Sequence, residues 1–384
     1  MRLGFGTTVL ERGISQGYMD GIGVYAKNLW EAFETAGGDL SVDRQAVSFG
    51  KNNSSTAAQM QLGETIHLPL SYPLQSARSI VSGQAFSGIR SVEEKIDLFF
   101  APDHHIPRLN HTPVIATIMD AYPLIHPELV SRRLRRFKNF AFKHASHWAD
   151  HIITISEYSK QDIGRYFDIP EERISVIPLG VNRQFLEVVP EATRESVCRK
   201  FGLNEKFFIF VGTIQPRKNL AKLIEAYESL PSDLRAEHHL LIVGHYGWGE
   251  ERLWQRLNKA EASGTIHHLQ NISDRELYAL LQSALALVYP SLYEGFGLPV
   301  LEGFASRIPV ITSPGTSIPE VAADAALYAN PLESSEIAAR MQSVAADEAL
   351  RRTLIEKGLQ RVARYSWERS AEEHLKLFGD FYRE

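Results

Sequence analysis

The feature that most constrains the fold is a regular alternation of short, almost continuously apolar runs with longer amphipathic stretches. Strands of a helix-covered parallel sheet are buried on both faces, so they appear in sequence as uninterrupted apolar runs. Five such runs in each half of the chain predict strands at 3–6, 96–100, 114–118, 152–155, 174–177, 207–211, 239–243, 265–269, 285–289 and 309–312. We therefore expect an α/β protein with two doubly wound, Rossmann-like domains.

The length of 384 residues also exceeds what one hydrophobic core usually serves. The last strand of the first half ends at Ile177, and the next clear helical pattern begins near Arg194, which places the hinge near residue 185. The predicted domains are therefore 1–185 and 186–365. Because ligands bind at the carboxyl ends of parallel strands, the cleft between the domains is the expected active site.

Composition excludes several classes of protein. With 41 basic and 46 acidic residues the chain has a formal charge of -5, so it has no overall field that would attract nucleic acid. The single cysteine, Cys198, cannot form an internal disulfide, which fits a reducing cytoplasm. The first apolar run is too short for a signal-peptide core or a membrane span. We expect a cytoplasmic protein with no nucleic-acid partner.

The most specific pattern is the segment Glu294-Gly-Phe-Gly-Leu-Pro-Val-Leu-Glu302, which follows the predicted strand 285–289. Its glycines allow backbone amides to approach a ligand, and Pro299 suits the first turn of a helix whose free N–H groups favour anions. Glu294 in the loop and Glu302 on the first helical turn are placed to accept hydrogen bonds from sugar hydroxyls. The loop residues expected to cradle the ligand are Gly295, Phe296, Gly297 and Leu298. The alternative is a tight turn in which Glu302 only complements a helix N-terminus.

A second pattern, Arg217-Lys218-Asn219, lies between the predicted strand 207–211 and a helical stretch from Leu220 towards Leu230. The planar fork of Arg217 and the compact charge of Lys218 together suit a diphosphate. Such a pair neutralises a departing nucleoside diphosphate and removes much of the need for a metal ion. The alternative is a solvated pair of surface charges.

Candidate residues in the first half also follow predicted strands. Gly21-Ile-Gly23 precedes a helical pattern, so its amides are candidates for binding phosphate, although two glycines before a helix commonly form only a turn. Asp120 follows the strand 114–118 and is placed to orient an acceptor or to receive its proton. Candidates for acceptor binding on the loop after the strand 96–100 are Asp103, His104 and His105. The alternative for these three is an ordinary solvated loop, and no metal-ligand spacing such as His-Glu-x-x-His is present.

The segment 131–144 mixes six cations with Leu134, Phe137 and Phe140 and predicts a basic amphipathic helix. A helix of this kind can lie on an anionic membrane with its aromatic side chains at the headgroup boundary. The alternative is a solvated helix packed on its own sheet.

The motifs together resemble the retaining glycosyltransferase family 4 of the GT-B fold, in particular its mannosyltransferase-like group. The resemblance is carried by Glu294 to Glu302 with seven residues between the glutamates, by Arg217-Lys218-Asn219, and by Gly21-Ile-Gly-Val-Tyr25. Other similar segments make the resemblance cover nearly the whole chain: 154–159, 176–182, 317–321 and 365–368.

This resemblance implies two Rossmann-like domains that face a deep interdomain cleft. The N-terminal domain would bind the acceptor, and a final helix at 366–384 would cross back to complete it. The C-terminal domain would bind a nucleotide sugar. By similarity, Arg217 and Lys218 bind the donor diphosphate, Glu294 the transferred sugar, Glu302 the ribose and the Gly21-Ile-Gly23 turn the phosphates.

The activity implied is transfer of a hexose, with retention of configuration, from a nucleoside-diphosphate sugar to a saccharide or lipid-linked saccharide in cell-surface polysaccharide synthesis. GDP-mannose is the first expected donor, and no cofactor or metal is expected. The expected catalytic residues are Arg217, Lys218, Glu294 and Asp120. Many relatives have a His-Asp pair where this chain has Met119-Asp120, so His104 or His105 is the substitute for that histidine. Two alternatives are a nucleotide-sugar epimerase of the same fold and a non-catalytic sugar-nucleotide-binding module.

Overall fold

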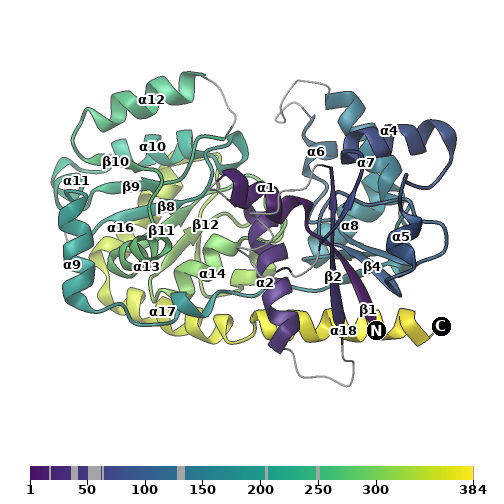
Figure 1. Cartoon of the computed structure of the whole chain (residues 1–384). Coiled ribbons are helices and arrows are strands. Elements are labelled where there is room, and N and C mark those ends of the chain that lie inside the picture. Colours follow the sequence, from purple (N-terminus) through teal and green to yellow (C-terminus); the bar gives the residue numbers. More distant parts are fainter. Residues whose placement is uncertain are drawn as a thin grey trace. The chain divides into compact units, whose positions relative to one another are not determined.

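The computed structural model describes residues 1–16, 19–35, 42–50, 62, 65–127, 135–203, 206–247 and 251–383. The chain divides into two compact units, which are Met1–Gly180 with Trp367–Glu384 (unit 1) and Val181–Ser366 (unit 2). The first change of unit thus falls at Gly180, whereas the sequence places it near residue 185. In each unit, helices flank a central sheet (Figure 1).

Unit 1 contains, in its described part, a parallel sheet of seven strands in the order β3-β2-β1-β4-β5-β6-β7. The strands are β1 (Arg2–Gly6), β2 (Asp43–Phe49), β3 (Thr65–Leu68), β4 (Leu98–Ala101), β5 (Val114–Thr117), β6 (His151–Thr154) and β7 (Ile174–Val176). The helices are α1 (Thr8–Gln16), α2 (Gly21–Thr35), α4 (Tyr72–Ser82), α5 (Arg90–Glu93), α6 (Tyr122–Ile125), α7 (Arg135–Ser146), α8 (Glu157–Phe167) and α18 (Trp367–Arg383), with a 3-10 turn η2 (Glu171–Arg173).

Unit 2 repeats the plan with a parallel sheet whose six described strands follow the order β10-β9-β8-β11-β12-β13. The strands are β8 (Phe208–Val211), β9 (Leu240–Val243), β10 (Ile266–Leu269), β11 (Ala286–Tyr289), β12 (Val310–Thr312) and β13 (Leu327–Tyr328). The helices are α9 (Glu191–Lys200), α10 (Leu220–Glu228), α11 (Ser232–Glu237), α12 (Glu251–Glu261), α13 (Asp274–Ser283), α14 (Leu298–Ala305), α15 (Ile318–Ala322), α16 (Ser334–Ala346) and α17 (Glu348–Val362), with 3-10 turns η3 (Arg183–Phe185) and η4 (Pro216–Lys218).

The predicted strands and the doubly wound architecture of both units are confirmed. Each of the ten apolar runs overlaps a strand, and in most of these strands the side chains are buried on both faces of the sheet. The sequence analysis did not find β2, β3 and β13. β2 begins with Asp43-Arg44-Gln45 and β13 has two residues, so neither carries a continuous apolar run.

The order of strands reverses at one place in each sheet. In unit 1 the chain winds outward from β1 to β3 and then returns to place β4 beside β1. In unit 2 it returns in the same way to place β11 beside β8. Loops that leave these neighbouring strands separate to opposite faces and leave a crevice at the carboxyl edge, where ligands bind in folds of this kind.

The last helix, α18, belongs to unit 1 and packs against α2. His374 on α18 is fully buried, with Nε2 2.8 Å from the Tyr25 hydroxyl, which lies 2.9 Å from the Thr117 hydroxyl. The His374 Nδ1 atom lies 2.6 Å from the Ser370 carbonyl oxygen and donates its proton there. Burial lowers the pKa of His374 to about 4, so the ring stays neutral. These bonds fix α18 in one register on the unit 1 core.

None of the helices in the described part of the chain combines the length and the apolar character needed to cross a membrane.

Candidate active site

The central group of unit 2 forms where β8 and β11 lie side by side. β8 is followed by η4, which carries Arg217 and Lys218, and β11 is followed by a loop that carries Glu294. The Leu292 amide donates to the carbonyl oxygen of Arg217 at 2.7 Å, and the Ser291 Oγ atom lies 3.0 Å from the same oxygen. The two loops are therefore joined by a backbone hydrogen bond, which brings Arg217, Lys218 and Glu294 together.

The Glu294 carboxylate lies between the two cations. Its Oε2 atom is 2.8 Å from Arg217 Nη1, and its Oε1 atom is 2.7 Å from Lys218 Nζ. Oε1 also accepts hydrogen bonds from the hydroxyls of Tyr289 at 2.8 Å and Ser291 at 2.5 Å. Lys218 Nζ donates in addition to the Tyr289 hydroxyl. Glu294 and Lys218 are buried, whereas 21% of the Arg217 side chain remains exposed, so Arg217 is the cation that a ligand can reach most directly.

The electrostatics of this group follow from its contacts. Burial alone would raise the pKa of Glu294, but the charges of Arg217 and Lys218 and the hydrogen bonds from Lys218 and Ser291 lower it to about 2. Burial raises the pKa of Tyr289 far above its usual value, and the charge of Glu294 raises it further. Glu294 is therefore an anion and Tyr289 a neutral donor over the whole physiological pH range.

The loop backbone is held as firmly as the side chains. The Ser317 hydroxyl donates to the carbonyl oxygen of Glu294 at 2.8 Å, and the Glu294 amide donates to the Thr316 hydroxyl at 3.2 Å. Gly297 precedes α14 with φ +105, and a Cβ atom there would lie 2.6 Å from Cδ1 of Ile318. A side chain at this position would strain the backbone and clash, so only glycine fits.

Two details of the predicted motif are corrected. Because α14 begins at Leu298, Glu302 is the fifth helical residue and opens the second turn rather than lying on the first. The ring of Phe296 is buried and packs edge-on against Tyr365, with centroids 5.7 Å apart. Any contact of Phe296 with a ligand at this loop therefore falls to its backbone.

Glu302 differs from Glu294 in its surroundings. It is half-buried, and no described residue donates a hydrogen bond to its carboxylate. Burial and the charge of Asp274 raise the pKa of Glu302 to about 7, against the opposing charge of Lys218. A carboxylate that titrates near neutral pH and has acceptor capacity to spare suits hydroxyl groups of a ligand.

Sequence reasoning missed the hydroxyl groups that hold Glu294. The sequence indicated Tyr289 only as the last residue of the predicted strand 285–289, and it gave no role to Ser291. The available signal was a pair of polar residues at the carboxyl end of an otherwise apolar strand, three and five residues before the glutamate.

In unit 1 the loop after β4 brings Asp103 and His105 together. Asp103 Oδ2 lies 2.8 Å from His105 Nδ1, and Asp103 Oδ1 accepts the His105 amide at 2.7 Å. Burial would raise the pKa of Asp103, but His105 and His104 lower it. The pKa of His104 falls to about 4 through burial and the neighbouring His105, so His104 is neutral.

The structure changes the prediction for Gly21-Ile-Gly23, which is not a turn before a helix. α2 begins at Gly21, and the Asp20 carboxylate accepts the Gly23 amide at 2.9 Å as an N-terminal cap. The charge of Arg12 lowers the pKa of His104 and the charge of Asp20 raises it, so both residues lie near His104. The start of α2 and the loop after β4 therefore share one edge of the sheet.

Asp120 follows β5, and its Oδ1 atom accepts the Tyr122 amide at 3.0 Å at the start of α6. β5 pairs with β4, so Asp120 and His105 leave neighbouring strands at the same edge. Their roles towards a ligand stay predictions.

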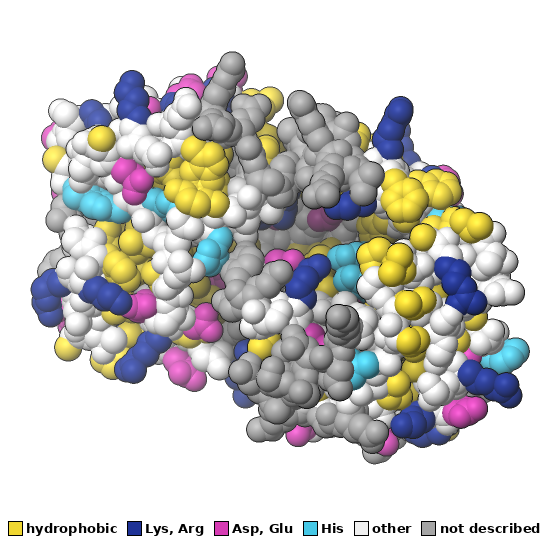
Figure 2. All heavy atoms as spheres, turned by 45° about the horizontal axis from the view of Figure 1, so that its top comes forward, with side chains coloured by type: hydrophobic (Ala, Val, Ile, Leu, Met, Phe, Trp, Pro, Cys, Tyr) yellow, Lys and Arg dark blue, Asp and Glu magenta, His cyan; other side chains and the backbone are white. Residues whose placement is uncertain are grey.

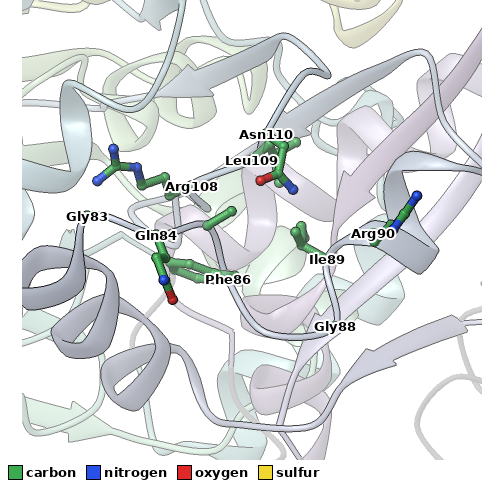
Figure 3. Close-up of a pocket in the computed structure, with 10 residues that line it drawn as sticks. Gly83, Gln84, Phe86, Gly88, Ile89, Arg90, Arg108, Leu109 and Asn110 are labelled. Carbon is green, nitrogen blue, oxygen red and sulfur yellow. The ribbon is translucent and has the colours of Figure 1, made fainter.

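A separate hollow of about 540 Å³ opens on unit 1, beyond the end of α4. Figure 3 shows Gln84, Phe86 and Leu109 around it, with the side chains of Arg90 and Arg108 directed to opposite sides. None of the residues predicted for the site lines this hollow. Within the described ranges, no three His, Cys, Asp or Glu side chains are grouped so that they could hold a metal ion.

Solved structures share the architecture of paired Rossmann-like units. HepE of Anabaena, crystallised with UDP and glucose, has a TM-score of 0.76 at 14% identity, with 99% of each chain covered. Sucrose-phosphate synthase of Thermosynechococcus elongatus has a TM-score of 0.74 at 19% identity, over 100% of this chain and 99% of that one. At these identities the likeness establishes the fold alone, which is the two-domain α/β fold called GT-B.

Sequence comparison gives the family within that fold class. Two family models match this chain. The model described as Glycosyltransferase Family 4 matches residues 19–185, and the model described as Glycosyl transferases group 1 matches residues 194–361. O-antigen chain mannosyltransferase B of Escherichia coli is 31% identical over 283 residues, which are 73% of this chain and 74% of that protein. Serotype-specific mannosyltransferase WbdA of Escherichia coli is 33% identical over 60% of this chain, but the match spans only 28% of WbdA. The chain belongs to glycosyltransferase family 4 and is an enzyme of the hexosyltransferase class.

The two glutamates of the motif should respond oppositely to loss of charge. Glu294→Gln leaves Arg217 and the buried Lys218 without their counter-charge, so the free energy of unfolding should fall by about 3–5 kcal/mol. Glu302→Gln, at pH 8, replaces an anion in an unfavourable site and should leave stability within about 1 kcal/mol of the wild type or raise it. Urea unfolding measures both, with hydrogen exchange at β8 and β11 assigning the change to unit 2. Equal losses in the two variants would contradict this assignment of charges.

Stability should also depend on pH through Glu302. Its folded-state pKa of about 7 lies above the ordinary value of 4.5, so the folded protein binds the proton more tightly. The resulting stability is complete below pH 4.5 and is lost as the pH rises through 7. Between pH 5 and pH 8 the wild type should lose on the order of 1–3 kcal/mol relative to Glu302→Gln, after allowance for solvent screening. Parallel pH profiles for the two proteins in urea unfolding would refute a raised pKa.

Proposed function

We propose that this enzyme transfers a hexose, with mannose as the first candidate, from a nucleoside-diphosphate sugar to a saccharide or lipid-linked saccharide. The new glycosidic bond keeps the anomeric configuration of the donor, and the reaction needs no metal ion. The product belongs to a cell-surface polysaccharide. The observation that carries the proposal is the group of Arg217, Lys218 and Glu294 at the β8 and β11 switch point.

The choice of sugar rests on relatives. O-antigen chain mannosyltransferase B, WbdA and the O-antigen chain mannosyltransferase RfbU of Salmonella typhimurium are all named as mannosyltransferases, and the first and the last are also named for the O-antigen chain. The matches cover 74%, 28% and 59% of those proteins, so the donor and the acceptor of this chain rest on analogy.

The site chemistry supports a diphosphate leaving group. Arg217, whose side chain is partly exposed, has a planar guanidinium suited to phosphate oxygens, and the neighbouring Lys218 adds a second positive charge. Glu294 holds both cations in place before a ligand arrives, which is the preorganisation that stabilises charge developing in a transition state. With two fixed cations, the departing phosphate can be neutralised without a divalent ion.

The reaction balances without a covalent protein intermediate. The acceptor oxygen forms a bond to the anomeric carbon on the face from which the diphosphate oxygen leaves. The proton of the acceptor hydroxyl passes to the departing phosphate, and the anomeric carbon passes through an oxocarbenium-like state. The enzyme contributes position and stabilisation of the negative charge on the leaving group.

Replacement of Arg217 should separate catalysis from folding. Arg217→Ala should lower turnover on the order of 10²-fold, the effect of losing a strong charge-stabilising donor. Lys222→Ala, at a partly exposed cation of α10 paired with Glu225, is the matched control and should keep wild-type turnover. The assay screens nucleotide sugars for nucleoside-diphosphate release in EDTA, with a mannose-terminated oligosaccharide as acceptor, and the anomer of the product is assigned by NMR.

Four outcomes of that screen would contradict the proposal in different ways. Activity that requires a divalent metal would remove the role given to the two cations. An inverted product would exclude attack on the face of the leaving group. An epimerised nucleotide sugar without a glycosidic product would identify an epimerase, and binding without turnover would identify a non-catalytic module.

We further propose that unit 1 touches an anionic membrane through α7. Of the predicted helix 131–144, residues 131–134 lie outside the described residues, and the rest lies in α7. Phe137 and Phe140 are 54% and 57% exposed, beside the exposed cations Arg136 and Lys138.

α4 packs against α7 and exposes Leu74 and other apolar side chains. Figure 2 shows apolar side chains gathered on this half of the molecule, with basic ones beside them. Aromatic and basic groups on one surface suit an anionic lipid headgroup region.

Truncation of the two exposed aromatic side chains tests the membrane proposal. The variant with both Phe137→Ala and Phe140→Ala should bind vesicles of phosphatidylglycerol at least about tenfold more weakly, because burial of each ring contributes roughly 1.5–3 kcal/mol. Val188→Ala, at a 71% exposed site of unit 2, should bind like the wild type, and high salt should weaken binding of both. Co-sedimentation measures the bound fraction, and undiminished binding of the double variant would exclude α7 as the contact.

A further inference from the structure

We propose that His105, held in one orientation by the buried Asp103, accepts a hydrogen bond at Nε2 from a hydroxyl group of the acceptor saccharide. Asp103 is then a positioning residue that does not touch the acceptor. This inference rests on the proposed function and names the group in unit 1 that binds the acceptor.

The first step is the arrangement of Asp103. Its side chain is only 3% exposed, and both of its oxygens face the same residue. Oδ1 accepts the His105 amide at 2.7 Å and Oδ2 lies 2.8 Å from His105 Nδ1. A carboxylate used in this way cannot turn towards a ligand without giving up two charge-assisted hydrogen bonds.

The second step is the state of the His105 ring. Because the ionised Asp103 carboxylate can only accept a hydrogen bond, an imidazole with one proton carries that proton on Nδ1. Nε2 is then an acceptor. A carboxylate that fixes the tautomer and direction of a histidine in this way is a common support for a ligand-binding imidazole.

The third step is the access of Nε2. In the described part of the chain, no residue forms a hydrogen bond with His105 Nε2. Buried polar atoms without a partner do not include Nε2, so this atom is not buried. With 12% of the His105 side chain exposed, Nε2 is therefore open to solvent. The ring itself is held by Tyr72, with centroids 4.8 Å apart, by Phe49 at 6.5 Å and by His104 at 4.3 Å.

Position and charge indicate the class of ligand. His105 lies after β4, the strand that adjoins β1 at the switch point of unit 1, where a ligand is expected. The anionic Asp103, which lies at the Nδ1 edge of the ring, disfavours a phosphate or carboxylate at Nε2. A neutral hydroxyl can donate a hydrogen bond to Nε2. An uncharged saccharide matches both conditions. His104 shares the loop, but no carboxylate fixes its ring in the same way.

The role given to His105 leaves the balance of the transfer reaction unchanged. The hydroxyl proton that His105 binds stays on its oxygen, or passes to the departing diphosphate if that hydroxyl is the attacking one. His105 neither gains nor loses a proton in this step. The contact lowers the acceptor KM and aligns the acceptor, and it has no part in cleavage of the donor.

The test compares transfer to acceptor with hydrolysis of the donor by water. His105→Ala should lower kcat/KM for a mannose-terminated trisaccharide by about 3–10-fold, the effect of one hydrogen bond, and this loss should exceed any loss in GDP release from GDP-mannose without acceptor. His105→Gln, whose amide oxygen can accept the same bond, should recover part of the loss. Asp103→Asn should raise the acceptor KM without changing that of the donor. His111→Ala, at an exposed histidine of the same loop, is the matched control.

Each failure has its own signature. Wild-type acceptor KM in His105→Ala would overturn the inference, and so would equal losses of transfer and hydrolysis in the Ala and Gln variants, which would mark a structural role. If the wild type releases no nucleoside diphosphate with any donor, the proposed function fails, and the inference fails with it. If the wild type transfers sugar normally, only the inference is at stake.

Discussion

The structure depends most on one buried carboxylate between two cations. Glu294 holds Arg217 and Lys218 from opposite oxygens, and two hydroxyl groups complete its shell. Placing three charges in a poorly hydrated site is unfavourable unless each has a partner. Because β8 and β11 lie side by side, the loops that follow them meet and this group can form. Gly297, Ser317 and the η4 turn hold the two loops in place.

The parallel winding of the chain makes this meeting predictable to a limited extent. Apolar runs identify β8 and β11, and a doubly wound sheet brings the carboxyl ends of such strands to one edge. The motifs that follow the two strands could therefore be expected to face a common ligand. The sequence could not predict which oxygen of Glu294 pairs with which cation, or that Tyr289 and Ser291 share Oε1, because those contacts depend on loop register and on side-chain rotamers. β2 was not predicted because its first three residues, Asp43-Arg44-Gln45, are polar; they pair with β1 only, and pairing with β3 begins at Ala46.

In unit 1 the loops were predictable but the roles within them were not. Asp103, His104 and His105 are adjacent in sequence, and nothing in their spacing separates them. The backbone turns so that Asp103 faces inward and binds His105 twice, and only this turn distinguishes the support from the group that faces a ligand. In the same way, Gly21-Ile-Gly23 could be a turn or a helix start, and the Asp20 cap decides for the helix because it satisfies an amide that would otherwise lack a partner.

The two glutamates of one motif show how a fold sets apart side chains of the same chemical type. Both belong to the segment that leaves β11, and burial alone would raise the pKa of each. Glu294 has two cations within 2.8 Å and remains an anion. Glu302 lies eight positions later, one turn into α14, where Asp274 is the charge that acts on it most strongly. The first glutamate is therefore committed to holding the cationic pair. The second has its charge balanced near neutral pH and its oxygens available, so a bound molecule that donates hydroxyl groups would shift Glu302 towards the ionised form. A molecule that brings further negative charge close to Glu302 would shift this carboxyl group towards the protonated form. A nucleotide sugar does both, because it carries hydroxyl groups and a charged diphosphate.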